Sequence, residues 1–97
     1  EASKPPTPPA LDVQEESEWI DMMVANTKLD HLTGELAFLR SKLLNYVDEL
    51  RSLLLQLSAL AAQPDNPVYE DKVADYRRYK AALLRVKRLI EDVTRNA

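Results

Sequence analysis

His31 is the chain's one histidine and stands beside Asp30, so it is the first residue to consider for chemistry. An imidazole next to a carboxylate occurs in general acid–base catalysis and in zinc sites. A closed zinc site is almost always four-coordinate, and the sequence has no Cys and no second His to complete the ligand set. We therefore interpret His31 as a solvated side chain and assign it no role.

Three glutamates, Glu15, Glu16 and Glu18, are close enough in sequence to imitate a paired-carboxylate site. Acids in the first turns of a helix are, however, the ordinary complement of the helix dipole. The sequence contains no nucleophile elbow, no Gly-rich phosphate loop and no metal-spaced cluster. We predict that the protein is not an enzyme, and we expect no catalytic residue, no metal ligand and no cofactor.

The segment 77–88 contains six basic residues and no acid. On a helix these bases spread over the side opposite the apolar stripe, which is typical of a solvated surface. The alternative is a face that binds an acidic protein surface or an anionic membrane. The net charge of −3 argues against nucleic acid, and we expect none. The candidate anionic-partner face comprises Arg77, Arg78, Arg85 and Arg88.

Helices must position these residues, because apolar side chains recur three and four residues apart from Met22 to Leu60. This spacing is that of a coiled-coil seam. A length of 97 residues, 45% apolar content and a single Gly fit one small all-α domain. No apolar run approaches the ~20 residues of a membrane span.

The N-terminal boundary follows from prolines and a cap. Four of the six prolines lie in residues 1–11, which we expect to form an extended or disordered arm. Asp12 is the predicted N-cap of helix 1, which we place over residues 13–62.

Pro64 ends one helix, and the next starts with Asn66 as its predicted N-cap and Pro67 at its first position. The predicted turn is 63–66, and helix 2 follows over 67–95. A connection this short requires antiparallel neighbours. The sequence therefore predicts that residues 12–97 form an antiparallel helical hairpin with coiled-coil heptads.

The two predicted helices differ in length, ~75 Å for helix 1 against ~43 Å for helix 2 at ~1.5 Å per residue. Residues 13–33 would then project with no intrachain cover. We predict that helix 1 continues through Gly34; a break there, giving a three-helix domain, is the alternative.

The overhang is apolar, so we expect a second copy or a helical protein partner to cover it. Two hairpins would then form a four-helix bundle. Trp19 is the best anchor, either within a homo-oligomer or as a hot spot for a different protein. The predicted interface comprises Trp19, Ile20, Met22, Met23, Leu29, Leu32 and Leu36.

One family resemblance lies in helix 2. The run from Asn66 to Tyr69, followed by Tyr79, Leu83 and the segment 86–92, resembles the last helix of the occludin and ELL homology domain. The similarity covers under a third of the chain, and the tyrosine-rich N-terminal pattern of that family is missing. No binding residue is carried over from it.

Together these patterns predict a non-enzymatic coiled-coil oligomerisation, scaffold or adaptor module that docks a protein partner through the exposed N-terminal part of helix 1. Two alternatives stay open. One is binding of an anionic membrane or acidic partner through the basic face, and the other is a small structural subunit of a larger complex. The chain begins at Glu1 and shows no signal-peptide pattern, so we expect an intracellular protein, present as a fragment or a processed mature form.

Overall fold

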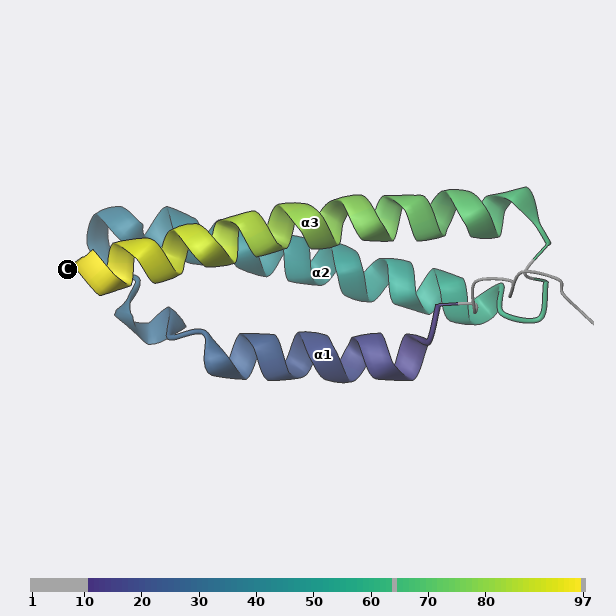
Figure 1. The fold of residues 1–97 in the computed structure, drawn as a ribbon, viewed down its shortest axis with the longest axis horizontal. Helices are drawn as coiled ribbons and strands as arrows, with labels where there is room; N and C mark the ends of the chain where they lie inside the picture. Colours follow the sequence, from purple (N-terminus) through teal and green to yellow (C-terminus); the bar gives the residue numbers. More distant parts are fainter. Residues whose placement is uncertain (1–10, 64, 97) are drawn as a thin grey trace, which may run out of the picture.

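The structure is a computed structural model that describes residues 11–63 and 65–96. These residues are all-helical, with three helices: α1 Val13–Asn26, α2 Ala37–Ala59 and α3 Pro67–Asn96. The helices lie along a common direction, and each runs antiparallel to the one before it (Figure 1). α2 and α3 make the largest helix–helix contact, and α1 packs mainly on α2. The antiparallel α2–α3 pair is thus the frame on which α1 is laid.

Side-chain caps start two of the helices where the sequence predicts them. The Oδ1 of Asp12 accepts a hydrogen bond of 3.0 Å from the amide of Glu15 at the start of α1. The Oδ1 of Asn66 accepts one of 2.9 Å from the amide of Val68 at the start of α3. Both predicted caps are confirmed. The predicted N-terminal arm, Leu11 excepted, lies outside the described residues.

The prediction of one continuous helix over residues 13–62 is wrong. α1 stops at Asn26, and two short 3-10 turns, Leu29–His31 and Gly34–Leu36, lead into α2. α2 itself ends at Ala59, before the predicted end of helix 1. The three-helix alternative is the one that the structure adopts.

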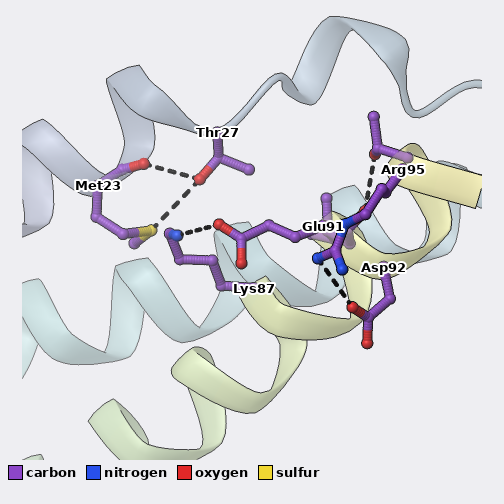
Figure 2. A network of polar contacts seen from close by, with 8 residues as sticks. Met23, Thr27, Lys87, Glu91, Asp92 and Arg95 are labelled. Carbon is purple, nitrogen blue, oxygen red and sulfur yellow. Dashed lines mark hydrogen bonds and ion pairs between the residues drawn. The ribbon is translucent and has the colours of Figure 1, made fainter.

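Two local features end α1 and turn the chain. The hydroxyl of Thr27 donates a hydrogen bond of 2.8 Å to the carbonyl of Met23, as Figure 2 shows. Thr27 has extended backbone angles and caps the helix with its own amide. Further along, Gly34 has φ +60°, a left-handed conformation that residues with a Cβ rarely adopt. The chain can therefore fold back at this point.

The predicted uncovered overhang at 13–33 is also wrong, because α1 and the following turns fold onto the chain's own core. Ile20, Met23 and Leu32 are 0%, 4% and 1% exposed. Burying each of these side chains is worth about 1.5–3 kcal/mol. A continuous helix would leave all three in water, so their burial favours the bend. The other buried apolar residues are Leu39, Leu43, Val47, Leu50, Leu53, Leu54, Leu57, Tyr69, Tyr76, Leu83, Val86 and Ile90.

A polar cluster fastens α1 to α3. The Oε1 of Glu16 accepts hydrogen bonds from the Tyr76 hydroxyl at 2.6 Å and from the Lys80 ammonium at 2.9 Å. The same ammonium lies 4.4 Å from the ring centroid of Trp19, a cation–π distance. On the other side of α1, Asp21 pairs with Arg51 of α2 at 2.7 Å.

The cluster shifts two pKa values. Burial alone would raise the pKa of Glu16, but the hydrogen bonds from Tyr76 and Lys80 and the Lys80 charge outweigh it and lower that pKa. Burial and the hydrogen bond to Glu16 raise the pKa of Tyr76. At neutral pH the carboxylate is therefore charged and the phenol keeps its proton, as their hydrogen bond requires.

Candidate docking groove between α2 and α3

One side of the α2–α3 pair is covered by α1, and the other side is an open groove. Lys80 reaches α1, whereas Ala82 lines the groove. Two residues along a helix turn it by about 200°, so these side chains lie on opposite sides of α3. On α2, Arg51 pairs with Asp21 of α1, and Glu49 lies two residues earlier. The side chains of Glu49 and Arg51 therefore also lie on opposite sides of their helix. The groove and α1 thus occupy opposite sides of the pair.

The centre of the groove is aromatic. Tyr46 of α2 and Tyr79 of α3 face each other with ring centroids 6.1 Å apart and ring planes inclined at 54°. Arg78 and Asp75 form an ion pair at the α3 edge. The groove has a volume of about 470 Å³ and is lined by Tyr46, Asp75, Arg78, Tyr79, Ala81, Ala82 and Arg85.

Tyr46 is the α2 residue that lines the groove, and the other lining residues come from α3. Helical periodicity predicts which further residues of each helix lie on the same side in a stripe, at alternating spacings of three and four. The stripes extend from the lining residues by helical periodicity, which keeps such positions on one side of a helix. The α2 stripe is Phe38, Lys42, Asn45, Glu49 and Ser52. The α3 stripe is Asp71, Asp75, Arg78, Ala82, Arg85 and Leu89. We use the name open face for these residues: Phe38, Lys42, Asn45, Tyr46 and Glu49 of α2, and Asp71, Asp75, Arg78, Tyr79, Ala82, Arg85 and Leu89 of α3.

Two apolar side chains lie at one end of the open face. Phe38 is 62% exposed and Leu89 is 47% exposed. Phe38 comes eight residues before Tyr46, and Leu89 comes ten residues after Tyr79. At ~1.5 Å per residue on antiparallel helices, both lie ~12–15 Å from the tyrosine pair in the same direction. This end is therefore suited to apolar contact with another helix.

The open face is also polarised in charge. Lys42 and Arg85 lie toward the end that carries Phe38, and Glu49, Asp75 and Asp71 lie toward the other. Arg78, which pairs with Asp75, and Lys72 also lie toward this second end, and they reduce its negative charge without reversing it. A helix or helix pair seated in the groove would meet charges of opposite sign at its two ends.

The structure divides the predicted interface residues. Ile20, Met23 and Leu32 face the intrachain core, so they offer no docking surface. Met22 is 56% exposed on the outer side of α1, turned about 200° from Ile20. The partly buried remainder packs against the core: Trp19, Leu29 and Leu36.

The candidate anionic-partner residues are divided as well. Arg78 and Arg85 line the groove, whereas Arg77 and Arg88 lie on the outer side of α3. Among the described side chains, Arg78 alone of the four has an ion-pair partner, Asp75. The four arginines therefore form two surfaces rather than one face.

His31, Glu15 and Glu18 are exposed. Over residues 11–63 and 65–96, no group of three or more His, Cys, Asp or Glu side chains could hold a metal ion. No helix in the described part of the chain is long and apolar enough to span a membrane.

Lys42, Asn45, Glu49 and Asp75 are not among the site residues predicted from the sequence. Their signal in the sequence was a second stripe at heptad spacing beside the apolar seam, with Lys42 and Glu49 seven residues apart. A polar stripe is recognisable as a groove only when the position of the third helix is known.

No protein-family model, curated protein or solved structure matches this chain. The resemblance of helix 2 to the occludin and ELL homology domain therefore gains no support from a family match.

Proposed function

We propose that this protein is a non-enzymatic oligomerisation, scaffold or adaptor module that docks a helical protein partner in the open groove between α2 and α3. α2 and α3 act as a hairpin that contributes two helices to a four-helix bundle, and the partner supplies the rest. The exposed N-terminal surface inferred from the sequence is not retained as the docking site, because Ile20, Met23 and Leu32 are buried in the core.

The observation that carries this proposal is the open groove beside the two longest helices. α1 fills one groove of the α2–α3 pair, and the matching groove on the other side has two tyrosines at its centre and Phe38 and Leu89 at one end. Amphipathic helices bind such grooves through residues at heptad spacing. The exposed apolar residues elsewhere, Leu55 and Met22 among them, are not accompanied by an aromatic groove.

Site-specific photocrosslinking tests the proposal. The chain has no Cys, so Ala82→Cys creates a single thiol in the groove, and Ser58→Cys creates the control thiol at an exposed position of α2 that is turned about 180° from Glu49. Each is coupled to a photoreactive maleimide and irradiated in an extract of the source cells. We expect a discrete protein adduct from position 82 that excess unlabelled chain suppresses.

The position-58 probe is expected to give no such adduct. Equal labelling from both positions, or none from position 82, would contradict docking in the groove. Mass spectrometry of the adduct shows whether the partner is a second copy or a different protein.

The second candidate function is binding of an anionic membrane or acidic protein surface through the outer side of α3. It is favoured by Arg77 and Arg88, which have no ion-pair partner among the described residues, and by Leu84, which is 44% exposed. Co-sedimentation with vesicles tests it. Binding to anionic but not zwitterionic vesicles, lost in Arg77→Glu/Arg88→Glu, would favour this function over groove docking.

A further inference from the structure

We propose that the occupant of the groove is a second copy of this chain, seated open face to open face with its helices reversed. The twofold axis lies across the helices at the level of the Tyr46–Tyr79 pair. This inference rests on the proposed function and specifies its partner. The observation behind it is that, apart from Arg78, the acidic and basic side chains of the open face lie on opposite sides of one common level on each helix.

On α3 this level is position 80, because Asp71 and Asp75 come before it and Arg85 comes after it. Reversing the helix about that level places Asp75 opposite Arg85 of the second copy, because 75 and 85 are equidistant from it. Arg78 then lies opposite Ala82, a residue small enough to admit a long side chain. Both residues of each pair line the groove. An antiparallel α3–α3 contact thus matches charge with charge and large with small.

The α2 stripe independently gives the same level. Lys42 and Glu49 are exposed and lie on either side of Asn45 and Tyr46. Reversal about a point between those two residues places Lys42 opposite Glu49 of the second copy. Asn45 would meet its own counterpart near the axis, and an amide can donate and accept at once. Since Tyr46 faces Tyr79, the α2 and α3 centres coincide within one residue.

The other face-to-face arrangement has its axis along the helices, and the charges oppose it. α3 of the second copy would then lie over α2 of the first, and each residue would keep its position along the helix axis. From the Tyr46–Tyr79 register, Arg85 would come within about two residues, or ~3 Å along the axis, of Lys42. Asp75 would come within about one residue, or ~1.5 Å along the axis, of Glu49. Like charges would face each other at both ends, so the reversed arrangement is favoured.

The surface available is adequate for a stable dimer. α2 has 23 residues, which gives a groove of ~35 Å, and two helices side by side are ~20 Å wide. The contact would bury on the order of 700 Å² per copy, close to the ~800 Å² of a standard interface. By the same reversal Leu89 lies opposite Asp71 of the second copy, since 71 and 89 are equidistant from position 80, and Phe38 lies opposite the region of Ser52. Val68, which is 48% exposed, lies within one helical turn of Asp71.

Charge reversal on α2 tests this arrangement by sedimentation velocity on the full chain. Lys42→Glu and Glu49→Lys are chosen because neither residue has an ion-pair partner within the described structure. In either homodimer, two attractive contacts become repulsive, and we expect the dissociation constant to rise about 10-fold. Asp48→Lys is the control, since it changes the charge equally at a position turned about 100° from Glu49.

Mixing the two variants is the decisive step. In the mixed dimer, position 42 of the Lys42→Glu chain faces position 49 of the Glu49→Lys chain, where the two introduced charges are opposite in sign. The unchanged Lys42 of the second chain faces the unchanged Glu49 of the first. Both contacts are therefore attractive, and we expect an equimolar mixture to regain the wild-type dissociation constant. A mixture that associates no better than either variant alone would overturn the reversed arrangement.

The remaining outcomes separate this inference from the proposed function. If the purified wild-type chain is a monomer but the position-82 probe still labels a different protein, the second copy is wrong and groove docking stands. If the chain is a monomer and the probe labels nothing, both are wrong. Circular dichroism melting of each variant checks that the fold is retained, so that lost association reflects the contact itself.

Discussion

The hydroxyl of Tyr76 in α3 donates a hydrogen bond of 2.6 Å to the carboxylate of Glu16 in α1, 60 residues earlier in the chain. This contact and the ion pair from Lys80 fix the axial position of α1 against α3. α1 therefore covers one side of the α2–α3 pair in a defined register and leaves the other side open.

Tyr76→Phe tests that contact. The ring stays in the core, and the loss of the hydroxyl removes one hydrogen bond to a charged acceptor, which should lower the free energy of unfolding by ~1–3 kcal/mol. Urea denaturation followed by circular dichroism measures it. Tyr79→Phe is the control, since the Tyr79 hydroxyl has no hydrogen bond within the described residues; an equal loss in both variants would contradict the role of the Tyr76 hydroxyl.

The pH dependence of stability should report on Glu16. Its pKa in the folded chain is lowered from the usual value of about 4.5, so the carboxylate stabilises the fold above that pH. This contribution is lost as the pH falls through the folded pKa. Urea titrations of the wild type and Glu16→Gln should therefore converge below about pH 4.5. Parallel curves across that range would show that the Glu16 carboxylate is not linked to folding.

Ile20→Ala and Met22→Ala test which side of α1 is in the core. Ile20 is 0% exposed and Met22 is 56% exposed. Truncating the buried isoleucine should cost ~2–5 kcal/mol, and truncating the exposed methionine under ~0.5 kcal/mol. Thermal or urea unfolding compares them. The opposite order would restore the continuous heptad stripe that includes Met22.

Gly34→Ala tests the turn before α2. An added Cβ would meet no atom within 4 Å, so its cost comes from the backbone conformation at φ +60°. A left-handed conformation costs a residue with a Cβ roughly 1–2 kcal/mol. Gly34→Asn should lose less, because asparagine tolerates this conformation. A gain in stability for Gly34→Ala would indicate that the segment is helical in solution.

The helical class, the two side-chain caps and the span of α3 could be predicted from the sequence because they depend on local signals. Asp12 and Asn66 cap through contacts within three residues, and the predicted span 67–95 differs from α3 by one residue at its end. Such signals do not require knowledge of the tertiary structure.

The break between α1 and α2 was missed because the leucine spacing continues through it. Leu29, Leu32 and Leu36 keep the heptad pattern, yet they lie in turns where Leu32 is still buried. The opposing signal was the composition of residues 26–34, which include Asn, two Thr, Asp, His and Gly, all weak helix formers. Burial of Ile20 and Met23 against the chain's own helices, a tertiary effect, decided the outcome.

The groove could not be predicted for a related reason. Its aromatic residues, Tyr46 and Tyr79, were recognisable as apolar positions of the two stripes. Which side of those stripes stays open depends on where α1 docks, and that follows from the contacts of Glu16 and Asp21 with residues more than 25 positions away.

The most direct test of the central claim is the solution mass of three proteins by light scattering at micromolar concentration: the wild type, Leu89→Glu and Leu55→Glu. Leu55 is the more exposed of the two leucines, at 75% against 47%, but it lies away from the open face. Docking between open faces predicts a dimer of about 22 kDa, twice 11.1 kDa, for the wild type and Leu55→Glu, and a monomer for Leu89→Glu. A monomeric wild type, or dimers lost equally in both variants, would contradict it.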